Sequence, residues 1–154
     1  MYASVFLDGL IERKVSFFVG VPDSYLHGFC SELRGRDDIL NVVVANEGNA
    51  VAAAAGQHLS TGSVPLVYMQ NSGLGNAVNP LASLVCKPML GIPMVLLIGW
   101  RGDPWHPDHV QHELQGEATP KMLDDFGIPY RGLGGEGLAA CEASEWAVSE
   151  ARTI

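Results

Sequence analysis

Glu47 is the residue whose type and position best suit acid–base chemistry. It follows a run of β-branched residues and opens an alanine-rich stretch. One interpretation is structural, because an acid in the first turn of a helix is stabilised by the helix dipole by about 0.3–1 kcal/mol. The other is functional, since a carboxyl group facing a dry cavity can hold or pass a proton. The small residues that follow favour either tight core packing or a subunit interface; they are Gly48, Ala50, Ala52, Ala53, Ala54, Ala55 and Gly56.

A second polar segment, residues 70–76 (QNSGLGN), follows an apolar run. At the start of a helix, backbone N–H groups can meet an anion. The dinucleotide-binding fingerprint requires a third small residue at position 78, where this chain has Val78, and this argues against a nucleotide site. A hydrolase nucleophile elbow requires glycine two residues before the serine, but Gln70 stands there, which disfavours Ser72 as a nucleophile.

Three histidines, His106, His109 and His112, stand three residues apart in a segment without a periodic pattern. They could surround a metal ion if the segment were helical. No dedicated metal motif has this spacing, so a solvated polar loop is the favoured interpretation.

Arg101 stands just past the most apolar stretch of an acidic protein. Its guanidinium can hold a carboxylate or a phosphonate bidentately. The alternative is a structural ion pair with Asp103. The sequence leaves both interpretations open.

Helical and strand patterns alternate along almost the whole chain. We expect helices over residues 2–14, 46–60, 75–85, 120–126 and 137–152, and strands over residues 16–21, 40–45, 65–70, 93–98 and 129–133. A further helix is expected between the first two strands, with Leu26, Phe29, Cys30 and Leu33 on one face. Asp23 or Ser24 is expected to cap the second helix, and Gly62 to end the third. Pro80 is expected to kink the fourth helix. The strand over residues 40–45 is expected to be buried.

This alternation predicts one α/β domain over residues 1–154, with a mainly parallel sheet between two layers of helices. In such sheets the chemistry gathers in the loops after the carboxyl ends of the strands. Those loops are residues 22–24, 46–49, 71–75 and 99–115, and they contain most of the unusual polar residues.

Composition and charge exclude several classes of protein. Apolar residues make up 47% and charged residues 17% of the chain, which indicates a globular protein. The net charge of −8 argues against nucleic acid as a partner. If the chain binds an anion, the cationic side chains that hold it must be local exceptions to this negative charge. The three cysteines lack metal-type spacing, and residues 91–100, the longest apolar stretch, are too few to span a bilayer. We therefore expect a cytoplasmic protein without membrane contact.

Four segments follow one another in a distinctive order. They are residues 20–24 (GVPDS), 45–50 (ANEGNA), 65–76 (PLVYMQNSGLGN) followed by Asn79-Pro80, and 92–102 (IPMVLLIGWRG). This set closely resembles the N-terminal, pyrimidine-binding domain of phosphonopyruvate decarboxylases. It is similar to sulfopyruvate decarboxylase as well, in which that domain is a separate alpha subunit. The likeness extends from about residue 2 to residue 131.

The resemblance implies thiamine diphosphate as cofactor. It assigns to Glu47 the glutamate that hydrogen-bonds N1′ of the aminopyrimidine and favours the imino tautomer, whose nitrogen takes the C2 proton. It places Asp23 and Ser24 near the reacting thiazolium as further catalytic candidates. The remaining candidates are listed by role: Asn71, Ser72 and Gly73 for cofactor binding, and Asn71, Ser72, Arg101 and His112 for the anionic 2-oxo acid substrate.

The chain lacks one segment of the family. Thiamine enzymes hold Mg²⁺ and the diphosphate with a Gly-Asp-Gly segment, which does not occur in this sequence. The resemblance therefore implies that a partner subunit or domain holds the metal and the diphosphate. We expect a hetero-oligomer, and a chain that is inactive without its partner.

The resemblance favours 3-phosphonopyruvate as substrate, with phosphonoacetaldehyde and CO₂ as products. The alternative is a sulfopyruvate decarboxylase alpha subunit, which performs the same chemistry on a sulfonate. A third possibility is a non-catalytic paralogue that only binds or regulates a partner. Residues 86–90 and 109–112 depart from the family pattern beside the expected substrate, whereas Glu47 and residues 71–73 are intact.

Overall fold

The computed structural model describes residues 3–133 and 139–153. Its helices are α1 (Ala3–Glu12), α2 (His27–Arg34), α3 (Glu47–Thr61), α4 (Leu74–Pro80), α5 (Val110–Asp125) and α6 (Ala140–Thr153). A 3-10 segment η1 (Asn71–Gly73) precedes α4, and a π-helical segment η2 (Leu81–Val85) follows it. Its strands are β1 (Phe17–Gly20), β2 (Leu40–Val43), β3 (Leu66–Gln70) and β4 (Val95–Gly99).

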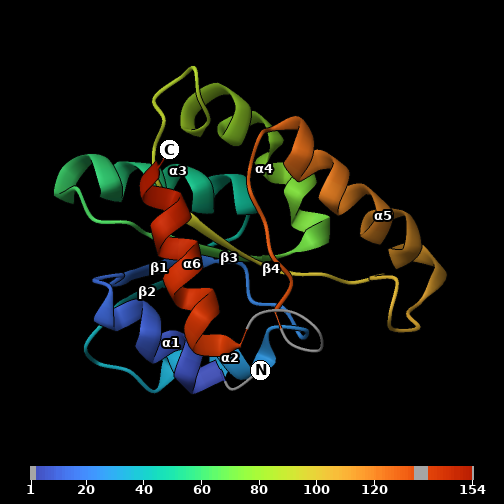
Figure 1. Ribbon diagram of the computed structural model, residues 1–154, viewed down its shortest axis with the longest axis horizontal. Helices are drawn as coiled ribbons and strands as arrows, with labels where there is room; N and C mark the ends of the chain where they lie inside the picture. Colours follow the sequence, from blue (N-terminus) through green and yellow to red (C-terminus); the bar gives the residue numbers. More distant parts are fainter. Residues whose placement is uncertain (1–2, 134–138, 154) are drawn as a thin grey trace.

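The four strands form one parallel sheet in the order β2-β1-β3-β4 (Figure 1). The register places Val19 of β1 opposite both Val42 and Val67. From β1 the chain moves outward to β2, and from β3 it moves outward in the opposite direction to β4. The topological switch point therefore lies between β1 and β3, where open α/β sheets bind their ligands beyond the strand ends.

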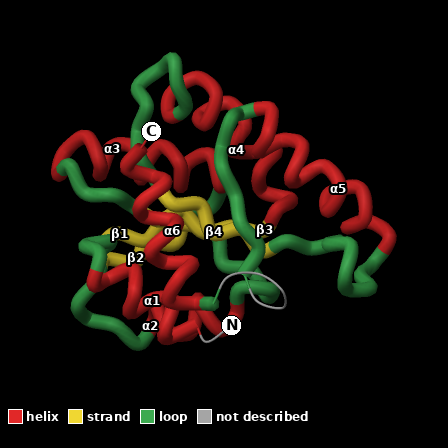
Figure 2. The backbone as a smooth tube through the Cα atoms, in the orientation of Figure 1, coloured by secondary structure: helices red, strands yellow, loops and turns green. Residues whose placement is uncertain are grey.

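Helices cover both faces of the sheet (Figure 2). Because successive side chains of a strand point to opposite faces, Phe18 and Tyr68 pack with residues of α1, α2 and α6 in one core cluster. Val19 and Met69 pack with α3, α4, η2 and Leu123 of α5 in a second cluster. The expected fold class, a parallel sheet between two helical layers, is confirmed.

Helix α3 begins and ends as expected. The side chain of Asn46 caps it by accepting a hydrogen bond from the Gly48 N–H at 2.8 Å. Gly62 ends it with φ +74°, a left-handed conformation that costs glycine little. One side of the helix, including Ala50 and Ala54, is buried in the core, and the opposite side is exposed. The small exposed residues are Ala52, Ala53 and Gly56.

Two expectations about the first half of the chain are wrong. Neither Asp23 nor Ser24 caps α2, because the helix begins only at His27 and the Asp23 carboxylate accepts from the Tyr25 N–H at 2.9 Å. Strand β2 is not buried, since it lies at the edge of the sheet and exposes 59% of Leu40 and 61% of Val43.

Helix α5 begins ten residues earlier than expected. Its first two turns leave Val110 and Leu114 exposed, so they lack the apolar periodicity that identifies a packed helix. Pro120 lies inside the helix and cannot donate to the carbonyl of Gly116. The indole N–H of Trp100 donates to that carbonyl at 2.9 Å, which replaces the missing hydrogen bond.

Three further expectations have different outcomes. The strand expected over residues 129–133 does not form; only an isolated bridge occurs at Leu133. The irregularity expected at Pro80 takes the form of a change from α4 to the π-helical η2. The expected start of the last helix, Gly137, lies outside the described residues. Among the residues that the structure describes, no helix has the length and apolar character needed to cross a membrane.

Candidate active site

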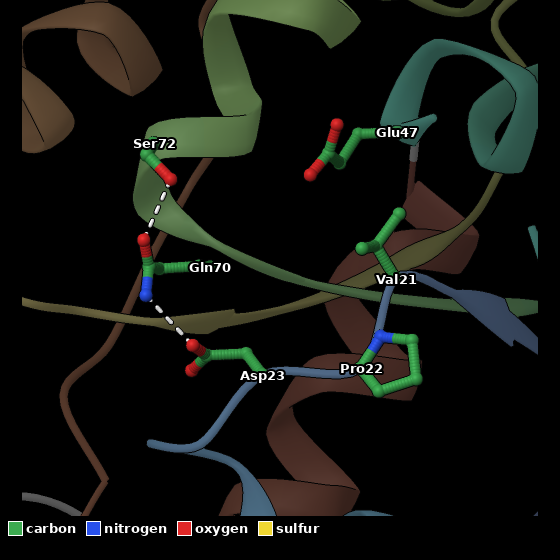
Figure 3. Close-up of a pocket in the computed structure, with 6 residues that line it drawn as sticks. All are labelled: Val21, Pro22, Asp23, Glu47, Gln70 and Ser72. Carbon is green, nitrogen blue, oxygen red and sulfur yellow. Dashed lines mark hydrogen bonds between the residues drawn. The ribbon is translucent and has the colours of Figure 1, made fainter. Parts of the chain in front are cut away.

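A pocket of about 220 Å³ opens at the switch point of the sheet (Figure 3). It lies where β1 and β3 end and α3 begins. Its lining residues are Val21, Pro22, Asp23, Glu47, Gln70 and Ser72. Three of the residues expected from the sequence, Asp23, Glu47 and Ser72, thus share one pocket.

Glu47 is the first residue of α3, so the Asn46 cap fixes where its side chain leaves the backbone. The side-chain amide of Asn76 donates to its Oε2 at 2.7 Å. Within the described part of the chain, Oε1 accepts no hydrogen bond from the protein. The carboxylate is therefore held by one oxygen, and the other is available as a hydrogen-bond acceptor.

Gly73 gives the Glu47 carboxylate its space. A Cβ at Gly73 would lie 2.5 Å from the Cγ, Cδ and Oε1 atoms of Glu47, closer than carbon atoms can approach. Gly73 therefore acts through the absence of a side chain. Asn76 follows it by three residues, a spacing that places two residues on one face of a helix, and both face Glu47.

A hydrogen-bonded chain crosses the opposite wall of the pocket. The Gln70 amide nitrogen donates to Oδ1 of Asp23 at 2.7 Å, and the Ser72 hydroxyl donates to Oε1 of Gln70 at 2.7 Å. Figure 3 shows this chain with the Glu47 carboxylate pointing toward the same space. Gln70 thus joins two of the expected site residues.

Asn71 lies beside the pocket but directs its amide elsewhere. It is 1% exposed, and its Nδ2 donates to the Arg101 carbonyl at 2.8 Å and to Oγ1 of Thr119 at 3.0 Å. Its Oδ1 accepts from the Arg101 N–H at 3.2 Å. The side chain ties the end of β3 to the end of β4 and to α5, and Asn71 is not among the lining residues.

Arg101 forms an ion pair within its own loop. Its Nε and Nη2 donate to the two carboxylate oxygens of Asp108 at 2.9 and 2.6 Å, and this bidentate pair raises the pKa of the guanidinium. The backbone N–H groups of Gly102 and His109 donate to the same carboxylate, and the Arg101 contact lowers the pKa of Asp108 most strongly. The alternative considered from the sequence, an ion pair of Arg101 with Asp103, is wrong in its partner, because Arg101 pairs with Asp108.

Asp103 instead joins the loop after β4 to the loop after β1. It accepts from Nδ1 of His106 at 2.9 Å and from the Tyr25 hydroxyl at 3.3 Å. Its burial opposes ionisation, but hydrogen bonds from His106 and the Trp105 N–H outweigh that effect and lower its pKa. Burial and the charge of Asp103 raise the pKa of Tyr25.

Ser24 and His112 are not among the residues that line the pocket. Ser24 is exposed in the loop after β1, whereas His112 is half-buried in the first turn of α5. The rings of His109 and His112 have centroids 6.5 Å apart. Across residues 3–133 and 139–153, no three His, Cys, Asp or Glu side chains gather as metal ligands.

Residues 1–123 match the family described as thiamine pyrophosphate enzyme, N-terminal TPP binding domain, and the chain belongs to this family. It is 40% identical over 116 residues to a phosphonopyruvate decarboxylase of Streptomyces viridochromogenes, covering 75% of this chain and 28% of that protein. It is 32% identical over 121 residues to a sulfopyruvate decarboxylase subunit alpha of Methanococcus maripaludis, covering 79% of this chain and 70% of that subunit.

A solved structure supports the same family. The thiamine diphosphate-dependent 4-hydroxybenzoylformate decarboxylase of Rhodococcus jostii RHA1 is 29% identical, with a TM-score of 0.56. The match covers 66% of this chain and 18% of that enzyme. The chain thus spans less than a third of the length of this enzyme and of the phosphonopyruvate decarboxylase.

The pocket fits one end of thiamine diphosphate. Glu47 has one carboxylate oxygen that accepts no hydrogen bond from the described residues, and its side chain fills the space that a side chain at Gly73 would need. At about 220 Å³ the pocket is smaller than the roughly 300–1,000 Å³ of sites that enclose a whole ligand of this size. It suits a single ring better than an entire cofactor.

Sequence reasoning missed two residues of this site. Gln70 and Asn76 both belong to a segment whose importance was evident, but neither was assigned a role. The position of Gln70 at the end of a central strand could have indicated that it lies at the site. The spacing of three residues between Gly73 and Asn76 could have indicated that they share one helical face.

Proposed function

We propose that this chain forms the pyrimidine-binding part of a thiamine diphosphate-dependent 2-oxo acid decarboxylase. A partner subunit or domain binds Mg²⁺ and the diphosphate and completes the active site. The favoured substrate is 3-phosphonopyruvate, which yields phosphonoacetaldehyde and CO₂. Residues 1–154 form one domain in this assignment, and the chain is inactive alone.

The observation that supports this proposal most strongly is the state of the Glu47 carboxylate. One oxygen is anchored by Asn76 at 2.7 Å, and the other faces the pocket at the switch point of the sheet. An anchored carboxylate keeps its orientation when a ligand arrives, which favours electrostatic preorganisation. A role limited to the helix dipole requires neither the Asn76 contact nor the close packing of the carboxylate against Gly73.

In the proposed reaction, thiamine diphosphate supplies the carbon nucleophile and the electron sink for decarboxylation. Glu47 would hold or release a proton at Oε1, toward a ring nitrogen of the bound cofactor. Asp23 and Ser72 lie on the opposite wall, where Asp23 would exchange protons with the reacting groups and Ser72 would orient them as a hydrogen-bond acceptor. Gly73 leaves room for the Glu47 carboxylate in this orientation.

Two observations support a partner. The pocket of about 220 Å³ is smaller than the roughly 300–1,000 Å³ of sites that enclose a whole ligand of this size. The exposed side of α3 has the small residues Ala52, Ala53 and Gly56, over which another protein surface can pack closely.

The acid groups of the substrate need cations, and Arg101 is the cation nearest in sequence to the site loops. Its Nε and Nη2 donate to Asp108, whose charge already neutralises the guanidinium. Cations from the partner therefore fit the role of binding the phosphonate better than Arg101 does. Substrate binding by His112 and Asn71 likewise requires a change from the arrangement described above.

A sulfopyruvate decarboxylase alpha subunit is the second candidate function. The chain is 32% identical to such a subunit and covers 70% of its length. Both substrates are anionic 2-oxo acids of similar size, so the same pocket serves either.

The test is to co-express this chain with a candidate diphosphate-binding subunit and to measure CO₂ release from phosphonopyruvate and sulfopyruvate. We expect release from one of them, dependent on both thiamine diphosphate and Mg²⁺. The chain alone should release none. A complex that binds the cofactor but releases no CO₂ from either acid would contradict the substrate class.

A further inference from the structure

Gln70 is the last residue of β3, which has a hydrogen-bonded strand on each side. Its backbone is therefore fixed by the sheet. Its half-buried side chain reaches the loop after β1 at Asp23 and the start of η1 at Ser72, each at 2.7 Å. One amide thus joins two chain segments that approach the pocket from different strands.

The direction of this chain follows from the chemistry of its groups. The amide nitrogen of Gln70 can only donate, and it faces Oδ1 of Asp23, which accepts. The carbonyl oxygen of Gln70 then faces Ser72, whose hydroxyl must donate its single hydrogen to it. The lone pairs of Ser72 Oγ remain for a ligand.

The opposite residue in β4 allows this arrangement. Gln70 pairs with Gly99, and a Cβ at Gly99 would lie 2.8 Å from Oδ2 of Asp23. The Asp23 carboxylate therefore occupies the space above Gly99. Its Oδ2 accepts from the Tyr25 N–H at 2.9 Å, which fixes the turn of residues 23–25.

We propose that Gln70 is the positioning residue of this site. Its amide holds the Asp23 carboxylate and the Ser72 hydroxyl in one chain and makes Ser72 a hydrogen-bond acceptor toward the ligand. The part concerning the ligand rests on the proposed function; the coupling of Asp23 to Ser72 does not.

The structural part is tested on the chain itself by amide hydrogen exchange. Gln70→Met keeps the length and apolar stem of the side chain but removes both hydrogen bonds. We expect exchange of the Tyr25 amide to accelerate roughly tenfold, because Asp23 loses the donor that orients it. Unchanged exchange at Tyr25 would overturn the proposal.

Gln57→Met is the matched control. Gln57 is also half-buried, and its amide also makes two hydrogen bonds, to Thr61 at 3.0 Å and Ser63 at 2.7 Å. It lies ten residues after Glu47 in α3, about 15 Å along the helix. Its variant should leave Tyr25 exchange unchanged. Equal acceleration in both variants would indicate general loosening and would overturn the proposal.

A double-mutant cycle identifies the route. If Gln70 acts on Tyr25 through Asp23, then Gln70→Met combined with Asp23→Ala should accelerate exchange no more than Asp23→Ala alone. Additive effects of the two substitutions would contradict that route.

The functional part is measured in the assembled complex. Gln70→Met should lower kcat roughly 10- to 100-fold, because proton-transfer groups lose their orientation. It should change the Kd of thiamine diphosphate by less than about threefold, since Glu47 and Asn76 are not altered. A large loss of cofactor affinity with unchanged kcat would contradict the assigned role. If the wild-type complex has no decarboxylase activity, the proposed function fails while the exchange result still decides the coupling.

Discussion

Gly73 and Glu47 approach each other so closely that a methyl group on the glycine would lie 2.5 Å from the carboxyl carbon of the glutamate. The pair is brought together by the end of η1 and the start of α3. The orientation of the carboxylate therefore depends on a position that has no side chain.

Gly73→Ala should displace the Glu47 carboxylate and lower kcat/KM of the assembled enzyme roughly 100-fold, because small misplacements of reacting groups are costly. Gly75→Ala is the control, since a Cβ at Gly75 would meet no atom within 4 Å. Decarboxylation assays and thermal unfolding of both variants make the comparison. Equal activities of the Gly73→Ala and Gly75→Ala enzymes would contradict the prediction, because they would show that the position of the Glu47 carboxylate does not depend on Gly73.

Glu47→Gln should lower kcat roughly 100-fold or more, because an amide cannot hold the proton that a carboxylate exchanges. The free energy of unfolding should change by only about 0.3–1 kcal/mol, the size of a helix-dipole contribution. Steady-state kinetics and urea unfolding measure the two effects.

Glu142→Gln is the matched control for that substitution. Glu142 is also an acid in the first turn of a helix, but it is exposed on α6. It should keep full activity. Turnover by the Glu47→Gln complex at the wild-type rate would remove Glu47 from the chemistry.

The Arg101–Asp108 pair should make stability depend on acidity. The pKa of Asp108 is lowered in the folded chain, mainly by Arg101. Its stabilising effect is therefore complete above the unfolded value of about 3.9 and is lost as the pH falls through the lower folded value. Urea midpoints should fall as the pH decreases below about 4, and less steeply for Asp108→Asn. The exposed Asp37→Asn should follow the wild type; equal slopes for all three proteins would argue against the pair.

Tyr68 should make the stability fall as the pH rises in the alkaline range, whereas Asp108 makes it fall as the pH decreases. It is 1% exposed, and burial raises its pKa to about 12. Between about pH 10 and pH 12 the phenol ionises in the unfolded chain but stays neutral in the folded chain, so stability falls as the pH rises. The loss from this group is roughly 2 kcal/mol, and Tyr68→Phe should abolish it.

The same variant should cost about 1 kcal/mol at neutral pH, because the hydroxyl donates to Asn41 at 3.0 Å. Denaturant unfolding from pH 7 to pH 12 tests both effects. Tyr130→Phe alters an exposed tyrosine and should leave the alkaline slope unchanged. An identical slope in Tyr68→Phe would assign the alkaline loss to other groups.

The sequence predicts most of the architecture because each packed element has a local pattern. Helix α3 has a capping asparagine and a terminating glycine, and β3 is a continuous apolar run. The early start of α5 was not predictable in this way, since Val110 and Leu114 are exposed and show no apolar face. Strand composition likewise could not show that β2 lies at the edge of the sheet.

The candidate site was predictable as a set of loops but not as a set of contacts. Chain position places Asp23, Glu47 and Ser72 at neighbouring strand ends, and the structure gathers them around one pocket. Side-chain direction depends on partners distant in sequence. Thr119 and the Arg101 backbone draw the Asn71 amide away, and Asp108 engages the Arg101 guanidinium.

The indole of Trp100 that donates to the Gly116 carbonyl makes Trp100 and Pro120 an epistatic pair. With Pro120 present, losing the tryptophan leaves a helix carbonyl without a donor. After Pro120→Ala the backbone N–H of residue 120 can supply that hydrogen bond, and Trp100→Phe becomes tolerable. Trp100→Phe is therefore tolerated if it follows Pro120→Ala, but it is destabilising if it comes first.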